Sequence, residues 1–223
     1  MSEPVVNPAH VEPGGTSWVA HLGTAMLRKC SVSTMDNNAY LLTCRRTGAQ
    51  VLIDAADDVD RLRTLVAEGS GRLDLVVTTH QHWDHHRALA AVVEHFGVPT
   101  AAGAEDAEAL PVPPTTLLRH GDQLAVGELR LDVIALRGHT PGSVALALRD
   151  GAGGAHLFTG DSLFPGGPGK TQDEAAFTSL MDDLETRVFG VYPDNTVVHP
   201  GHGDSTTLGA ERPHLADWRA RGW

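Results

Sequence analysis

The sequence lacks several features that would place it in a familiar class. Only two cysteines, Cys30 and Cys44, occur in 223 residues, which excludes a disulfide framework and makes both ordinary strand residues in our interpretation. No apolar run approaches the ~18 residues of a membrane-spanning helix. The first ten residues contain neither the basic nor the apolar segment of a signal peptide, so we expect a cytoplasmic protein with no membrane contact.

Basic residues are also scarce. The 28 acidic residues exceed the 17 basic ones, which gives a formal net charge of -11. Because a negative field repels phosphate backbones, nucleic acid is not expected as a partner. The hydrophobic fraction of 41% is large enough for one sizeable core, as expected for a single large domain.

The order of apolar patterns predicts two similar halves, each made of a sheet and helices. Residues 1–16 are rich in Pro and Gly and are expected to form an arm, and residues 17–223 a single domain. Two packed sheets with helices on their outer faces are the simplest architecture for this order. Strands are predicted at 18–22, 26–33, 39–44, 50–54, 73–78, 117–118, 128–136, 143–148, 156–159 and 196–199, and helices at 60–68, 86–96, 174–189 and after residue 207.

The segment TTHQHWDHH, residues 78–86, follows one of these apolar strands and holds four histidines and an aspartate. If the chain stays extended, His80, His82 and Asp84 point to one side, and His85 begins a helix. Imidazole nitrogens and carboxylate oxygens are ligands that suit zinc and iron. This density of ligands at a strand end therefore predicts a metal site rather than a solvated loop.

Three further candidate ligands follow predicted strands in the same way. His139 lies in RGHTPGS, Asp161 in FTGDSLF and His202 in HPGHGD. Glycines flank each of them and allow the backbone to approach a crowded centre. Asp54 also ends a strand, and it either accepts a hydrogen bond from a ligand histidine or caps a turn.

These motifs, in this order, resemble those of the metallo-β-lactamase superfamily over roughly residues 17 to 208. The resemblance implies an α/β fold, a four-layer αββα sandwich, with a dinuclear site at one edge. It implies that one metal is held by His80, His82 and His139, and the other by Asp84, His85 and His202, with Asp161 bridging the two.

The chemistry of such a site is hydrolysis by a metal-bound hydroxide. Two divalent ions ~3.5–4 Å apart polarise a carbonyl group and lower the pKa of a water molecule between them. We expect two ions, zinc first, with iron or manganese as alternatives, and we expect Asp84 to act in catalysis as well as binding metal. A small acyl compound is the expected substrate.

Within the superfamily, the local sequence is most similar to the type II glyoxalases (hydroxyacylglutathione hydrolases). TTHQHWDHH resembles their THHHWDH segment, and FTGDSLF followed by GPGK resembles their FTGDTLF and GCGK segments. The second match makes Lys170 the candidate anchor for an anionic thiol carrier. An S-2-hydroxyacyl thioester is therefore the expected substrate.

The sequence also departs from that pattern. His86-Arg87-Ala88 replaces a run of small residues, Thr171-Gln172 replaces an aromatic pair, and only 21 residues follow His202. A different thiol or a non-thiol acyl substrate therefore stays open. The main alternatives are a persulfide dioxygenase with a single iron, which is an oxidoreductase, and a lactonase.

Overall fold

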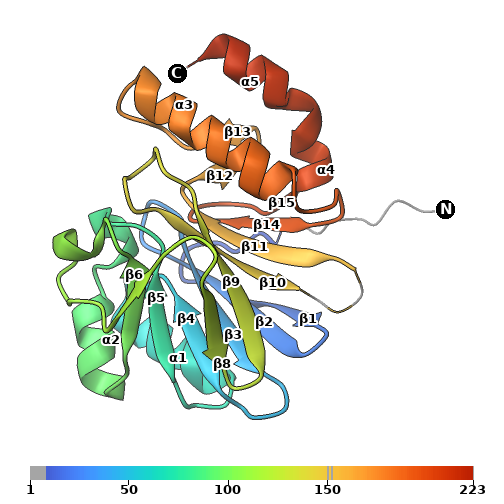
Figure 1. Cartoon of the computed structure of the whole chain (residues 1–223). Helices are drawn as coiled ribbons and strands as arrows, with labels where there is room; N and C mark the ends of the chain where they lie inside the picture. The colour runs from blue at the N-terminus through green and yellow to red at the C-terminus, as the bar shows by residue number, and fades with distance from the viewer. Residues whose placement is uncertain (1–8, 150, 152, 223) are drawn as a thin grey trace.

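The computed structural model describes residues 9–149, 151 and 153–222. They form two β-sheets packed face to face with helices on both outer faces (Figure 1). This arrangement confirms the predicted αββα sandwich. Residues 1–8 of the predicted arm lie outside the described residues, whereas Ala9 and Val11 are buried and Gly14 donates a backbone hydrogen bond to Ser31.

The first sheet holds its strands in sequence order. Its first four strands are antiparallel neighbours, and β4 to β7 are parallel. Helices follow β4 and β5, as crossover connections between parallel strands require. The elements are β1 (Trp18–Leu22), β2 (Ala25–Val32), β3 (Asn37–Cys44), β4 (Gln50–Ile53), α1 (Val59–Glu68), β5 (Leu75–Thr78), the 3₁₀ turn η1 (Trp83–His85), α2 (Leu89–Phe96), β6 (Thr100–Gly103), the 3₁₀ turn η2 (Ala107–Ala109) and β7 (Thr116–Leu118).

The second sheet has the order β15-β14-β11-β10-β9-β8. Only β11 and β14 are parallel neighbours, and a short ribbon of β12 and β13 lies outside the sheet. The elements are β8 (Gln123–Val126), β9 (Leu129–Ala135), β10 (Val144–Arg149), β11 (Ala155–Gly160), β12 (Leu163–Phe164), β13 (Gly167–Pro168), α3 (Glu174–Asp183), the π-helical turn η3 (Leu184–Phe189), β14 (Val197–Pro200), β15 (Thr206–Thr207), α4 (Leu208–Glu211), the 3₁₀ turn η4 (Arg212–His214) and α5 (Leu215–Arg221).

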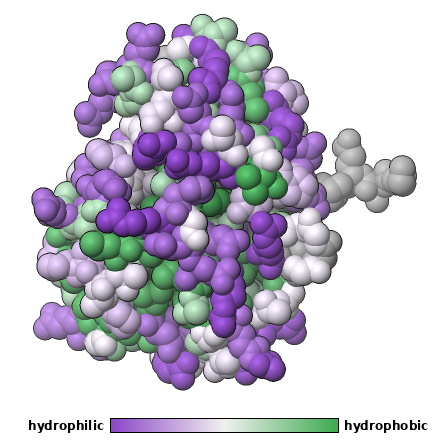
Figure 2. Space-filling view, in the orientation of Figure 1, coloured by the Kyte–Doolittle hydropathy of each residue, from purple (hydrophilic) through white to green (hydrophobic). Residues whose placement is uncertain are grey.

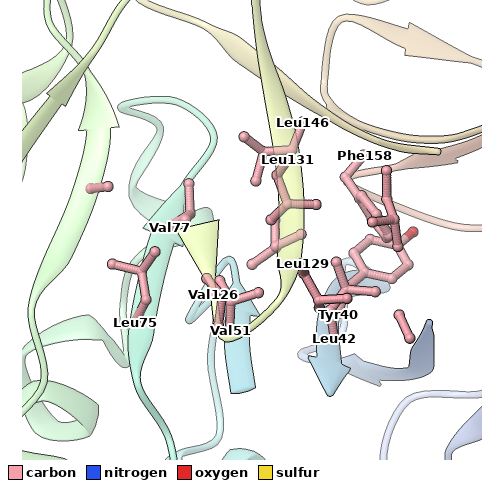
Figure 3. Close-up of a cluster of buried hydrophobic side chains, with 14 of the residues drawn as sticks. Tyr40, Leu42, Val51, Leu75, Val77, Val126, Leu129, Leu131, Leu146 and Phe158 are labelled. Carbon is pink, nitrogen blue, oxygen red and sulfur yellow. The ribbon is translucent and has the colours of Figure 1, made fainter. Parts of the chain in front are cut away.

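Three apolar layers hold the sandwich together. Alternate residues of β3 face opposite sides: Tyr40 and Leu42 enter the layer between the sheets, and Leu41 packs under α1 and α2. Figure 3 shows the middle layer, in which Leu131 and Phe158 of the second sheet meet residues of the first. Each fully buried large side chain contributes about 1.5–3 kcal/mol. The third layer lies between the second sheet and α3, η3, α4 and α5.

Three strands that the sequence patterns did not predict complete the sheets, β6, β8 and the short β15. The β6 sequence, Thr-Ala-Ala-Gly, has low strand propensity because small residues offer little to pack. Its composition follows from a close approach of two backbones: a Cβ atom on Gly103 would lie 1.9 Å from the carbonyl oxygen of Gly142. Glycine is required there so that the loop after β9 can lie against β6.

The two cysteines lie on adjacent strands but not opposite each other. Cys30 on β2 pairs with Ala39, and Cys44 on β3 pairs with Ala25. Both are buried and free, which confirms them as ordinary strand residues. In the described part of the chain, no helix has the length and apolar character needed to cross a membrane.

Candidate metal centre

All of the predicted ligands follow the carboxyl ends of strands at one edge of the sandwich. His80 and His82 follow β5, and Asp161 and His202 follow the parallel strands β11 and β14. His139 follows β9, which runs in the same direction as β11 because each is antiparallel to β10 between them. The shared direction of these strands explains why residues far apart in the sequence meet.

Seven side chains come together there in three overlapping groups that could hold metal ions. Within each group the potential ligand atoms lie within 4.8 Å of one another. Asp161 lies between the groups, with its carboxylate oxygens 3.3 Å, 3.7 Å and 3.4 Å from the Nε2 atoms of His85, His139 and His202. The groups are His80 with His82 and His139, His80 with His85 and Asp161, and Asp84 with His85 and His202.

The local path of the chain differs from the extended one that would place Asp84 beside His80 and His82. Residues Trp83–His85 form a 3₁₀ turn, and the backbone N–H of His85 donates to the carbonyl of His82. The turn carries Asp84 toward His202 and places His85 beside both His80 and His202. A single sharp turn thus divides one short motif between two groups.

Hydrogen bonds on the far side of the rings orient the inner nitrogens toward the cluster. The Nδ1 atoms of His85, His139 and His202 donate to Asp54, to the Lys170 carbonyl and to the Met35 carbonyl, at 2.9, 2.6 and 2.8 Å. Because these partners only accept, each Nδ1 carries a proton and each ring turns its Nε2 toward the cluster, the orientation that metal-binding imidazoles require. Among the described residues the buried Nε2 atoms of His80 and His139 have no hydrogen-bond partner. This donor set fits divalent metal ions.

Asp54 accepts a hydrogen bond from a histidine of the cluster, which is one of the two roles predicted for it. It is buried, and its carboxylate accepts from His85 Nδ1 and from both the backbone N–H and the hydroxyl of Thr79. Its backbone adopts φ +59, a left-handed conformation that costs a non-glycine residue about 1 kcal/mol or more. The three hydrogen bonds compensate for that strain and fix the orientation of His85.

Two residues that position members of the cluster were missed by the sequence analysis. Asn37 on β3 donates to both the backbone carbonyl and the Oδ2 atom of Asp84, at 3.1 and 2.9 Å. Asp106, after β6, is fully buried and accepts from the backbone N–H of Gln81 and the hydroxyl of Thr140. No spacing pattern in the sequence distinguishes either from an ordinary loop or strand residue.

Electrostatics differ between the two ends of the cluster. Burial lowers the pKa of His80 well below its usual value, and burial also lowers the pKa of His139. Burial opposes protonation of His85 too, but hydrogen bonds to Asp161 and Asp54 outweigh it and raise its pKa to about 10. Hydrogen bonds from His202 and His85 hold the pKa of Asp161 far below its usual range although burial would raise it.

Metal binding is therefore expected to release protons unequally. At pH 7 His80 and His139 are already neutral, whereas His85 must lose a proton before it can bind a metal. Affinity at the group of Asp84, His85 and His202 should rise with pH up to about 10 and fall in acid. Zinc titration calorimetry at pH 7, in buffers of different ionisation enthalpy, should report more protons released by the ion that binds Asp84, His85 and His202 than by the ion that binds His80, His82 and His139. Buffer-independent heats for both ions would contradict this.

Access to the cluster comes from a cavity of about 410 Å³ lined by His82, His139, Lys170, Thr171 and Gln172. The sequence has two lysines, Lys29 and Lys170; Lys29 is buried and Lys170 is exposed at this cavity. The Nε2 atom of His86 donates to the Gln81 carbonyl and is not directed into the cluster. His86 therefore stabilises the loop between His80 and His85.

Comparisons with known proteins agree with this geometry. Residues 33–202 match the Metallo-beta-lactamase superfamily. A hydroxyacylglutathione hydrolase from Jannaschia sp. is 35% identical over 75% of this chain, and the match covers 62% of that protein. The chain thus spans about 62% of the length of such curated relatives.

Two solved structures are similar in both fold and sequence. ETHE1 from Myxococcus xanthus superposes with a TM-score of 0.76 and 32% identity, covering 87% of this chain and 84% of that one. A protein designated TTHA1623, solved in a di-iron-bound form, gives a TM-score of 0.67 and 32% identity over 82% and 96% of the two chains. With the converging histidines and aspartates, the match over residues 33–202 shows that the chain belongs to the metallo-beta-lactamase superfamily.

Proposed function

We propose that this protein is a metal-dependent hydrolase of thioesters, with an S-2-hydroxyacyl thiol as the expected type of substrate. The observation that carries the proposal is the cluster itself, in which seven potential ligands converge beside an open cavity containing a lysine. The similarity to curated hydroxyacylglutathione hydrolases supports the thioester as the bond that is cleaved. The partner is thus a small acyl compound.

The proposal assigns His80, His82 and His139 to one ion, Asp84, His85 and His202 to a second, and Asp161 to both. Zinc is the expected metal, with iron or manganese as alternatives. Divalent ions, when bound, supply the Lewis acidity that activates water and polarises a carbonyl group.

The protein's own residues contribute position and charge. Asn37 holds Asp84 Oδ2 by a hydrogen bond that, against the effect of burial, keeps the pKa of Asp84 below its usual value. Asp84 is therefore a carboxylate at neutral pH and can accept a proton from the attacking water. Asp54 and the carbonyls of Lys170 and Met35 hold three imidazole rings in place with their Nε2 atoms toward the cluster.

Lys170 is expected to bind an anionic group of the thiol carrier. Lys170→Gln should raise KM for an anionic thioester roughly tenfold, the loss of one charged hydrogen bond, and leave KM for a neutral thioester nearly unchanged. Steady-state kinetics on S-lactoylglutathione and on a neutral thioester would measure this. Arg149 is an exposed arginine on β10 outside the cavity. Arg149→Gln is therefore the matched control and should leave both KM values unchanged. An equal change in KM for both thioesters would remove Lys170 from the binding site.

The alternative function is that of a persulfide dioxygenase with a single iron, and the similarity to ETHE1 from Myxococcus xanthus favours it among the alternatives. Metal analysis and a substrate panel separate the two. Two equivalents of metal with turnover of S-lactoylglutathione support the hydrolase. One equivalent of iron, with oxygen consumed in the presence of glutathione persulfide and no thioester cleavage, would overturn it. Cleavage of lactones alone would instead indicate a lactonase.

A further inference from the structure

A second cavity, of about 390 Å³, lies on the α3 side of His139. It shares His139 and Gln172 with the cavity that contains Lys170, and it shares Arg137 and Pro141 with a smaller recess of about 180 Å³ behind it. On the face shown in Figure 2, hydrophilic side chains gather where α3 meets the loops of the two sheets. The three hollows are therefore neighbours, in order from His139 at the cluster to Arg137 and the recess.

The recess concentrates positive charge in an otherwise acidic protein. Arg119, Arg137 and Arg187 all line it, from the ends of β7 and β9 and from η3. Their carboxylate partners are Asp183 and Glu105. The three guanidinium groups and their two carboxylate partners together carry a net charge of +1, whereas the formal net charge of the whole chain is -11.

His120 also lines the recess. Burial first, and then the nearby Arg187 and Arg137, lower its pKa below the usual value. His120 is therefore neutral at neutral pH, and it adds hydrogen-bonding capacity to the recess without changing its charge.

Arg137 is held in a fixed orientation with donor capacity left over. Buried Asp183, at the end of α3, accepts from its backbone N–H, its Nε and its Nη2 at 3.0, 2.9 and 2.7 Å. Its Nη1 makes no hydrogen bond with the residues that the structure describes, and its side chain is 54% exposed. A guanidinium fork fixed in this way is pre-organised for an anionic oxygen.

We propose that Arg137, supported by Arg119 and Arg187, binds the anionic end of the thiol carrier of a thioester substrate. The inference rests on the proposed function and deepens it: the scissile carbonyl lies beside His139, and a carboxylate or phosphate of the carrier extends along the cavity to Arg137. Lys170 and Arg137 then lie on opposite sides of Gln172. The substrate class is an acyl thioester whose carrier bears an anion distant from the sulfur.

The test measures binding without turnover. S-methylglutathione, its diethyl ester and S-methyl-coenzyme A are titrated calorimetrically into the metal-loaded protein, because these thioethers cannot be hydrolysed. Arg137→Gln should weaken binding of the carboxylate probe or of the phosphate probe roughly tenfold, and should leave binding of the diethyl ester unchanged. The probe that loses affinity identifies the anionic group.

Two further variants guard against a purely structural effect. Arg119→Gln removes a more exposed arginine that Asp183 does not hold, and should weaken the same probe by a smaller factor with an unchanged melting temperature. Arg149→Gln should change nothing. The proposal is overturned if the unaltered protein binds neither anionic probe. It is also overturned if the Arg137 and Arg119 variants bind the charged and the esterified probes with the same affinity as the unaltered protein. Arg137-dependent binding without any thioester turnover would overturn the proposed function and leave the anion site standing.

Discussion

Asp161→Ala is expected to lower thioester hydrolysis at least about a thousandfold, the effect of several kcal/mol of lost transition-state stabilisation. The reason is its position: its two oxygens lie within 3.7 Å of the Nε2 atoms of His85, His139 and His202. No other carboxylate in the cluster reaches both groups of ligands. His82→Ala, on the opposite side of the cluster, should also abolish hydrolysis.

Metal content measured by plasma mass spectrometry should fall with activity in both variants. Asp217→Ala, on an exposed part of α5, is the control and should keep full metal and full activity. Full activity of either ligand variant would be incompatible with the proposed metal centre.

Asp106→Ala is expected to have the second largest effect, although Asp106 belongs to none of the ligand groups. Its carboxylate joins two ligand-bearing loops: Oδ2 accepts from the N–H of Gln81, which lies between His80 and His82, and Oδ1 accepts from the N–H of Gly142. Removing it leaves two backbone donors without their acceptor, one buried and one part-buried, and a buried unsatisfied donor costs about 1–3 kcal/mol. Loss of ligand orientation should weaken metal binding by about 10–100-fold.

Thermal unfolding and competitive zinc titration measure the two parts of this prediction separately. Glu108→Gln, two residues away and exposed, is the matched control. A variant that loses stability but binds zinc normally would show that Asp106 supports the fold alone and does not position the ligands.

Sequence patterns identified the members of the cluster better than the residues that position them. His139, Asp161 and His202 stand out because each follows an apolar strand and is flanked by glycine, a local signal that needs no knowledge of the fold. Asp106 gives no such signal. Its role depends on the close approach of Gly103 and Gly142, which joins two sheets through residues 39 positions apart. That contact exists only once both sheets are formed.

The same limit applies to secondary structure and to the proposed role of Arg137. Strands with alternating or continuous apolar residues, such as β1 and β10, were predicted nearly to their ends, whereas the Ala- and Gly-rich β6 was missed. Arg137 lies two residues before a predicted ligand, but its partner Asp183 is 46 positions away. Only the packing of α3 against the loop after β9 turns an exposed arginine into a fixed donor.

Seven side chains that follow four strand ends are proposed to hold a pair of metal ions. The most direct test is anomalous diffraction from crystals grown with zinc, recorded above and below the zinc absorption edge. Two anomalous peaks are predicted, one among His80, His82 and His139 and one among Asp84, His85 and His202, with Asp161 between them. A map in which zinc binds elsewhere on the protein, while these seven side chains contact only one another or solvent, would contradict the account.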